Sequence, residues 1–340
     1  MKIITYLSVI GFLLAGCTQS ISAISAVQPA ILPLATAALP AATASQPVDS
    51  PTPTTSLQAS RLPAIPDFEH IVLILLENEY FQDIIGNPQL AHLNALAKKN
   101  VLLTNYFAVS HPSLPNYLAL VSGSTQNITK DCLDCFVNQP NLADEIEASG
   151  RTWKSYQESM PAPCFIGDSF PYVQMLNPFL YFDSIRLNKT RCDQSIVPLT
   201  QLDNDLSASS LPNFALIMPD MCDSGHDCDP VKADNWVDGV VAKLQAAPAF
   251  GQNSLIVITF DEGTEHGSTD INQTSANFHG QIATVLISPK ARQGFTDASS
   301  YTHYSLLKTV LEAWNLPALG QTAKDTVPAI LAPWSTTPGE

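Results

Sequence analysis

Basic residues are scarce in this sequence. Its 340 residues include 16 Lys and Arg against 31 Asp and Glu, which gives a formal net charge of −15. A surface that neutralises nucleic-acid phosphates needs the opposite balance, so we expect no nucleic-acid partner. The chain also lacks an internal repeat, a Gly-rich dinucleotide motif and a P-loop, which argues against the nucleotide sites that such motifs build.

Long apolar runs are missing after the N-terminus, so no later segment is predicted to span a membrane. The N-terminus itself has Lys2, an apolar run over 3–14 and the sequence Leu-Ala-Gly before Cys17. This pattern is typical of a secretory signal, and its ending resembles a bacterial lipobox. We expect residues 1–17 to act as a lipoprotein signal, with Cys17 lipidated and the protein exported to the bacterial cell surface or periplasm, attached to the membrane. An ordinary signal peptide or a membrane anchor is the alternative.

Charge and aromatic side chains are nearly absent from residues 18–66, which are mainly Ala, Ser, Thr and Pro. Such a segment buries too little apolar surface to offset its ordering entropy. We therefore interpret 18–66 as a flexible tether and 67–340 as the folded domain, with an inserted loop or cap around 130–195.

Seven cysteines are present, and setting Cys17 aside leaves six. An even number in an exported chain favours disulfides, although six cysteines allow 15 connectivities. We expect local pairs, Cys132 with Cys135, Cys164 with Cys192, and Cys222 with Cys228. Half of a zinc site is the alternative for the first pair, but no second pair follows at zinc-site spacing.

Apolar runs that predict buried strands alternate with segments of helical periodicity. The expected strands are 70–76, 101–107, 152–156, 213–219, 254–260 and 281–288, and the expected helices are 88–99, 117–121, 142–148, 233–245 and 304–314. This alternation predicts the α/β class, as a three-layer α/β/α sandwich with a mostly parallel central sheet. The turn-rich, aromatic segment 161–191 is expected to form a lid or cap.

Polar residues follow several of these strands at the point where each one ends. Because parallel strands bring their carboxyl ends to one edge of the sheet, we expect these side chains to converge. Clustered carboxylates repel one another and are costly without a cation, so the pattern predicts one or two divalent metal ions. Zinc, manganese, iron, magnesium and calcium all remain open. The candidate ligands are Glu77, Asn78, Asp220, His226, Asp261, Glu262 and His279.

Each of these pieces has a structural alternative. Glu77-Asn78 is also typical of a turn or helix cap, and Asp261-Glu262 of a polar strand end. The aspartates of 220–229 are also consistent with a solvated, disulfide-closed loop. The metal hypothesis depends on their occurrence together, at separate strand ends, in the order that the sheet topology requires.

Ser113 is the candidate nucleophile. It lies between two prolines in the sequence Ser-His-Pro-Ser-Leu-Pro-Asn-Tyr, residues 110–117, after an expected strand and before an expected helix. A hydroxyl held at such a junction is where α/β hydrolytic enzymes often place a nucleophile.

With these motifs in order, the chain resembles the bacterial phosphoesterase family that includes acid phosphatases and phosphate-specific phospholipases C, within the alkaline phosphatase superfamily. The resemblance covers residues from about 70 to 317. Its carriers are 70–78 (HIVLILLEN), 111–117 (HPSLPNY), Ser122-Gly123-Ser124, Pro219-Asp220, 225–228 (GHDC), 259–263 (TFDEG), 278–280 (FHG) and 301–305 (YTHYS).

The resemblance implies a role for each candidate. Ser113 would attack phosphorus and form a phosphoseryl intermediate, beside a metal held by Glu77, Asn78, Asp261 and Glu262. Asn116 would donate a hydrogen bond to a phosphoryl oxygen, and His111 and His303 are candidates to act on the leaving group. Asp220, His226 and His279 match positions of a second metal in nucleotide pyrophosphatase-like relatives. Tyr117 stands where sulfatases carry an arginine, which argues against a sulfatase.

The resulting hypothesis is a metal-dependent phosphoesterase that hydrolyses small phosphomonoesters in the manner of acid phosphatases. Phosphodiester cleavage of the phospholipase C type is the alternative, and an open polar pocket would favour monoesters where an apolar groove would favour lipids. A metal-binding surface lipoprotein without turnover is a further alternative.

Overall fold

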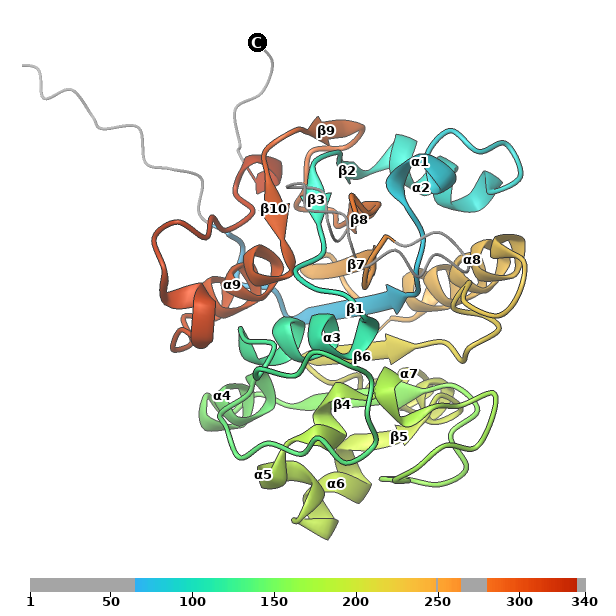
Figure 1. Ribbon diagram of the computed structural model, residues 1–340. Coiled ribbons are helices and arrows are strands. Elements are labelled where there is room, and N and C mark those ends of the chain that lie inside the picture. Colours follow the sequence, from blue (N-terminus) through green and yellow to red (C-terminus); the bar gives the residue numbers. More distant parts are fainter. Residues whose placement is uncertain (1–64, 249, 264–279, 335–340) are drawn as a thin grey trace, which may run out of the picture. The chain divides into compact units, whose positions relative to one another are not determined.

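A central β-sheet organises the part of the chain that the computed structural model describes, residues 65–248, 250–263 and 280–334 (Figure 1). All of these residues belong to one compact unit. Eight described strands form the sheet, and β8 alone among them runs antiparallel to both neighbours. In sheet order they are β5 (Ile196–Pro198), β4 (Trp153–Gln157), β6 (Phe214–Met218), β1 (His70–Leu76), β7 (Ser254–Phe260), β8 (Thr284–Ile287), β2 (Val101–Leu103) and β9 (Phe295–Asp297).

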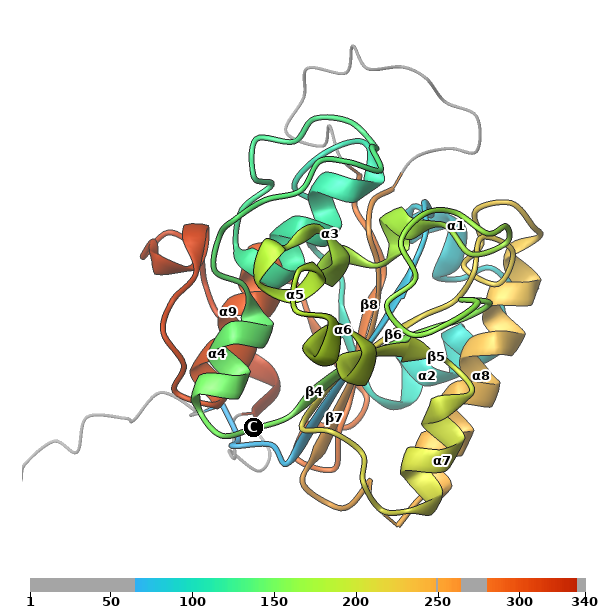
Figure 2. The ribbon, with the colours of Figure 1, turned by 90° about the horizontal axis from the view of Figure 1, so that it is seen from below.

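Helices cover both faces of the sheet (Figure 2). One face carries α3 (Ser113–Ser122), α4 (Leu142–Ala148) and α9 (His303–Ala313), and the other carries α2 (Ala91–Lys99), α7 (Gln201–Ser207) and α8 (Pro230–Ala246). The shorter helices are α1 (Phe81–Ile84), α5 (Asp183–Arg186) and α6 (Lys189–Ser195), and the 3₁₀ turns are η1 (Gln174–Leu176), η2 (Pro178–Tyr181), η3 (Gly320–Ala323) and η4 (Ala332–Trp334). The expected three-layer α/β/α sandwich is confirmed. None of the described helices is long and apolar enough to cross a membrane.

The middle strands are buried on both faces, which explains their continuous apolar sequences. Every residue of β1 and β7 is buried, and both strands have the bounds expected from the sequence. The expected strand 101–107 is instead two strands, because the chain leaves the sheet after β2. Its second part, β3 (Tyr106–Phe107), pairs with β10 (Tyr301–Thr302) in a separate two-stranded sheet.

Helix α3 is enclosed over its whole length, since all ten of its residues are buried. It ends at Gly123, whose φ of 70° is a left-handed helix cap. A side chain at Gly123 would place its Cβ 2.1 Å from the carbonyl oxygen of Leu319, so only glycine fits. This termination fixes α3 against the C-terminal segment and leaves its first residue, Ser113, at the carboxyl edge of the sheet.

The segment 130–195 does not form one continuous insertion, because it contributes β4 to the central sheet and α6 packs against β4 and β5. Its turns η1 and η2 pack against α3. The three expected disulfides are present, Cys132–Cys135, Cys164–Cys192 and Cys222–Cys228. The first two join parts of this segment internally. The expected signal peptide, Cys17 and the tether lie outside the described residues, apart from the tether's last two positions.

Candidate active site

Glu77 and Asp261 lie side by side because of the register of two parallel strands. Leu76 of β1 pairs with Phe260 of β7, so the residues that follow them leave the sheet at the same level. The backbone N–H of Asp261 donates to the carbonyl oxygen of Leu76 at 3.0 Å. Both carboxylates are fully buried. The convergence expected from the topology is therefore present at these two strand ends.

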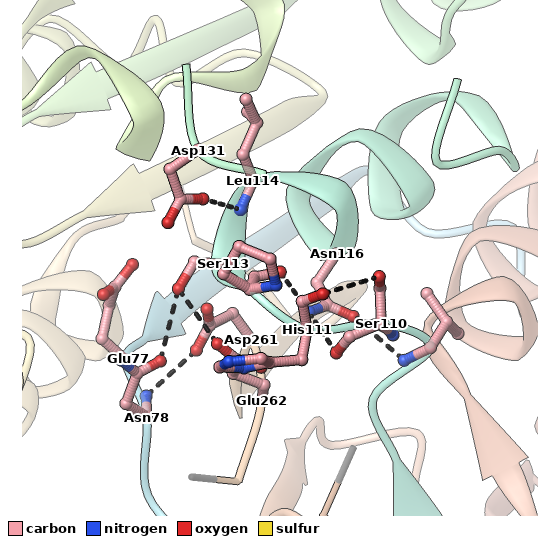
Figure 3. A network of polar contacts seen from close by, with 12 residues as sticks. Glu77, Asn78, Ser110, His111, Ser113, Leu114, Asn116, Asp131, Asp261 and Glu262 are labelled. Atoms are coloured by element: carbon pink, nitrogen blue, oxygen red, sulfur yellow. Dashed lines mark hydrogen bonds and ion pairs between the residues drawn. The ribbon is translucent and has the colours of Figure 1, made fainter. Parts of the chain in front are cut away.

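The hydroxyl of Ser113 faces this pair from the first turn of α3 (Figure 3). Its Oγ lies 3.3 Å from Oδ1 of Asn78 and 3.3 Å from Oε1 of Glu262. Asn78 adopts a φ of 55°, in the left-handed region that Asn tolerates better than most residues. Its N–H donates to Oδ1 of Asp261 at 3.0 Å, which holds the strained residue in place. Four expected ligands and the expected nucleophile thus share one site.

Among the residues that the structure describes, three buried carboxylate oxygens at this site have no hydrogen-bond partner, Oε1 and Oε2 of Glu77 and Oδ2 of Asp261. Burial, followed by the nearby charges of Asp261 and Glu262, raises the pKa of Glu77 well above its usual value. Burial, followed by the charge of Glu262, does the same to the pKa of Asp261. Unpartnered buried carboxylates are costly, and a bound cation is the ordinary way to satisfy them. Together with the amide oxygen of Asn78, they make a donor set that fits a hard or borderline divalent metal ion.

His111 contacts the same cluster from the outer side. Its Nδ1 lies 2.6 Å from Oε2 of Glu262, while 26% of its side chain is exposed. The hydrogen bond to Glu262 raises the pKa of His111. Burial raises the pKa of Glu262, and His111 opposes that shift. His111 and the Ser113 hydroxyl thus share Glu262 as a partner, and the imidazole of His111 is partly exposed to solvent.

The side chain of Asn116 contacts the loop that precedes α3. Its Oδ1 accepts from the N–H groups of Val109 and Ser110, and its Nδ2 donates to the carbonyl oxygens of Ser110 and Pro112. The side chain is fully buried. Both amide hydrogens are used by the loop that precedes α3, so Asn116 positions this loop, and its expected hydrogen bond to a phosphoryl oxygen stays a prediction.

His303 lies behind Asp261 and contacts it through the backbone. His303 is the first residue of α9 and is fully buried. Its Nε2 lies 2.5 Å from the carbonyl oxygen of Asp261, and its Nδ1 lies 3.2 Å from the Tyr106 hydroxyl. Burial lowers the pKa of His303 to about 4. A neutral imidazole enclosed behind Asp261 fixes the backbone there, and a role of His303 at the substrate stays a prediction.

The residues predicted for a second metal are distributed differently. Nε2 of His226 lies 3.9 Å from Oε2 of Glu77, so this histidine faces the site. Asp220 instead accepts hydrogen bonds from the Ser159 hydroxyl and from the N–H groups of Cys222 and Asp223. Asp220 caps the turn that follows β6. Its carboxylate forms a cluster with the carboxylates of Glu158 and Asp223. His279 lies outside the described residues.

Asp131 belongs to the site although the sequence did not suggest it. Its Oδ1 accepts the N–H of Leu114, the residue after Ser113, at 2.9 Å (Figure 3). Its charge is among the influences that raise the pKa values of Glu77 and His111. The only signal in the sequence was its place directly before the disulfide-bonded Cys132, because no strand end or motif marks it.

An α/β/α sandwich with a serine hydroxyl and clustered carboxylates at the carboxyl edge of its sheet is the arrangement of an alkaline phosphatase-like hydrolase. The sequence profile of the Phosphoesterase family matches residues 87–317. The chain belongs to this family, and the expected class of hydrolases acting on phosphoric ester bonds is confirmed.

Two relatives illustrate the similarity. The chain is 33% identical over 291 residues to a phosphate-repressible acid phosphatase from Penicillium chrysogenum, covering 79% of this chain and 67% of that protein. It is 30% identical over 275 residues to a phosphatidylinositol-3-phosphatase from Mycobacterium tuberculosis, covering 79% of this chain and 83% of that protein. The chain spans only 56–60% of the length of three further acid phosphatases that it matches.

Solved structures resemble this chain in fold. An alkaline phosphatase superfamily protein from Vibrio parahaemolyticus has a TM-score of 0.51 at 14% identity, covering 77% of this chain and 72% of that one. A phosphonate monoester hydrolase from Silicibacter pomeroyi has a TM-score of 0.52 at 11% identity, covering 80% and 78%. Both confirm the alkaline phosphatase-like sandwich.

Proposed function

We propose that this protein is a metal-dependent phosphomonoesterase in which Ser113 is the nucleophile. The observation that carries the proposal is the position of the Ser113 hydroxyl, 3.3 Å from Asn78 and 3.3 Å from Glu262, beside the unpartnered carboxylate oxygens of Glu77 and Asp261. The names of the acid phosphatase and phosphatidylinositol-3-phosphatase relatives, both phosphomonoesterases, support hydrolysis of monoesters ahead of diesters.

Glu77, Asn78, Asp261 and Glu262 would hold the divalent cation, with the Ser113 hydroxyl next to them. When bound, such a cation lowers the pKa of a neighbouring hydroxyl and stabilises charge on phosphoryl oxygens. The fit depends on the three carboxylate oxygens that have no hydrogen-bond partner within the described part of the chain. His226, 3.9 Å from Glu77, is placed to influence the same carboxylate from the exposed side.

The residues of the chain then carry the reaction in two steps. Ser113 passes its hydroxyl proton to Glu262, whose Oε1 lies 3.3 Å away. The Oγ of Ser113 forms a bond to phosphorus as the bond to the leaving alcohol oxygen breaks, which gives a phosphoseryl ester. Protonated His111, held by Glu262 and 26% exposed, is the proposed proton donor to the leaving oxygen. Water then attacks phosphorus as the bond to the Ser113 oxygen breaks, a proton of the water passes to that oxygen, and phosphate is released. Asn116 and His303 hold the loop and the strand end that carry these groups.

Replacing the nucleophile provides the test. Ser113→Ala is expected to abolish hydrolysis of p-nitrophenyl phosphate while leaving the circular dichroism spectrum and the metal content unchanged. Ser110→Ala is the matched control, because it removes a hydroxyl from the same loop. The Ser110 hydroxyl makes only a long contact, 3.5 Å, with the carbonyl oxygen of His111. Exhaustive chelation with verified metal loss is expected to stop turnover, and single cations added back to restore it.

Retained hydrolysis in Ser113→Ala would contradict the role of Ser113 as the nucleophile. Activity that survives verified metal loss would contradict the dependence on a metal ion. A protein that binds metal but hydrolyses neither monoesters nor diesters would instead be a metal-binding surface lipoprotein. Faster turnover of bis(p-nitrophenyl) phosphate than of the monoester would make the protein a phosphodiesterase.

We further propose that the protein is exported and anchored to the membrane through a lipid on Cys17. Support comes from the Leu-Ala-Gly-Cys ending of the N-terminal apolar run and from three disulfides, which are typical of oxidising compartments. Metabolic labelling with a fatty acid is expected to mark the wild type, and Cys17→Ser is expected to remove the label. An unlabelled wild-type protein in the soluble fraction would contradict the anchor.

A further inference from the structure

A pocket of about 250 Å³ opens next to Asp131. Its lining is largely apolar, and two carboxylates stand among the apolar groups. The lining residues are Asp131, Cys132, Leu133, Asp168, Val173, Met175 and Met221. A cavity of this size holds less than a drug-sized ligand, which usually occupies at least about 300 Å³. It suits one compact group, such as a single ring.

Asp131 joins this pocket to the catalytic residues. It lines the pocket and also accepts the N–H of Leu114, which directly follows Ser113. Met221 adds a second connection, because it lies in the turn that follows β6, at the same carboxyl edge of the sheet as Glu77. A group bonded to a phosphoryl unit at Ser113 therefore has this pocket as a neighbouring space.

The walls of the pocket are held in place by buried hydrogen bonds. Gln174 is fully buried, and its carboxamide links the two loops that form the walls. Its Nε2 donates to the carbonyl oxygen of Leu133 at 2.8 Å, and its Oε1 accepts the N–H of Gly167 at 2.7 Å. The Cys132–Cys135 disulfide closes the first loop. The pocket is thus preformed, which lowers the entropic cost of filling it.

The chemistry of the lining selects the occupant. Thioether and aliphatic side chains favour an apolar or aromatic group. The carboxylates of Asp131 and Asp168 oppose a second negative charge through like-charge repulsion. We propose that this pocket receives the leaving group, and that the enzyme prefers phosphomonoesters with a compact apolar or aromatic leaving group that carries no second acidic function. This inference rests on the proposed phosphomonoesterase function.

Two matched substrate pairs test the preference in the wild type. Cyclohexylmethyl phosphate and ethyl phosphate are both esters of primary alcohols and differ in apolar bulk. We expect kcat/KM to be at least about tenfold higher for the cyclohexylmethyl ester, as found for added methylenes in apolar pockets. Phenyl phosphate and 4-carboxyphenyl phosphate differ in one negative charge, and we expect the phenyl ester to be preferred by about fivefold or more.

Reversing the charge of the pocket provides the sharper test. Met175→Lys keeps a long unbranched side chain and adds a positive charge to the lining, so it is expected to shift the phenyl to 4-carboxyphenyl ratio of kcat/KM toward the acidic substrate by about fivefold. Leu187→Lys is the matched control, because it adds the same charge at a residue that is 68% exposed and does not line the pocket. Its ratio is expected to stay that of the wild type.

The outcomes separate this inference from the function on which it rests. If Ser113-dependent hydrolysis occurs but both substrate pairs react equally, or if the two lysine variants shift the ratio alike, the pocket assignment is overturned and the phosphomonoesterase stands. Faster turnover of a dispersed diacylglycerol phosphate than of the cyclohexylmethyl ester would also overturn it, in favour of a lipid groove. If none of the monoesters is hydrolysed in a Ser113-dependent way, both proposals are contradicted.

Discussion

The imidazole of His303 lies directly behind Asp261, with its Nε2 2.5 Å from the carbonyl oxygen of that residue. The carbonyl can only accept, so Nε2 carries the proton and Nδ1 is free to accept from the Tyr106 hydroxyl at 3.2 Å. This fixes the neutral tautomer. A strand end that carries a candidate metal ligand is therefore supported by a histidine that stays uncharged.

The buried His303 makes stability depend on acidity. Burial lowers its pKa to about 4 in the folded state, so the unfolded chain binds more protons between that value and the usual pKa. Stability is then lost as pH falls through this window, by roughly 3 kcal/mol in total. His303→Gln, which retains an N–H donor, is expected to flatten this part of the pH dependence in urea titrations. An unchanged slope in the variant would contradict the assignment.

The buried Glu77 is expected to act in the opposite direction when no cation is bound. Its raised pKa means that the folded state holds a proton that the unfolded chain releases, so metal-free protein loses stability as pH rises above the usual carboxyl pKa. A divalent cation should therefore raise Tm more at about pH 7.5 than at about pH 5, by at least roughly 4 °C.

Glu77→Gln tests the origin of that effect by differential scanning fluorimetry of chelated protein. The variant is expected to be more stable than the wild type near pH 7.5 without metal, and to gain little from added cation. Equal cation gains in the two proteins would show that the stabilising ion binds elsewhere.

Asn116 is expected to matter for stability as well as for activity. Its side chain makes four hydrogen bonds to the backbone of residues 109–112. Asn116→Ala should cost about 4 kcal/mol of unfolding free energy, at roughly 1 kcal/mol for each bond, and lower kcat by misplacing Ser113. Asn116→Asp retains the acceptor and is expected to lose less. A raised KM with unchanged stability would instead indicate direct phosphate binding.

His111 is expected to set the alkaline limb of the activity profile. Its hydrogen bond to Glu262 raises its pKa, and a proton donor must hold its proton, so kcat should fall as pH rises through that raised pKa. His111→Gln is expected to lower kcat by about 100-fold or more and to remove this limb. A variant that retains the wild-type alkaline limb would exclude His111 as the donor.

Some parts of the site follow directly from local sequence. The strands β1 and β7 were predicted with their observed bounds, because strands buried on both faces are continuous apolar runs. Glu77 and Asp261 follow from those bounds and from the parallel topology. The three disulfides were predicted from local pairing, and the largest sequence separation among them is 28 residues.

Other parts could not be read from spacing. Asn116 and His303 stand in the motifs that the sequence singled out, and the structure shows that the side chains of both contact backbone groups of the protein. Asp220 follows a strand as expected, but its carboxylate caps its own turn. A sequence pattern predicts where a residue lies along an element, and it does not determine which partner its side chain contacts.

The sequence by itself determined the order of strands and helices, the carboxylates at the strand ends and the serine that faces them, because burial and parallel pairing depend on apolar runs and chain direction. Only the tertiary structure decided that Asp131 joins Ser113 to an apolar pocket and that His303 supports Asp261. The physical reason is that these contacts join segments far apart in the chain, such as Asp261 and His303, 42 residues apart, and their geometry exists only once the sheet and α3 have packed.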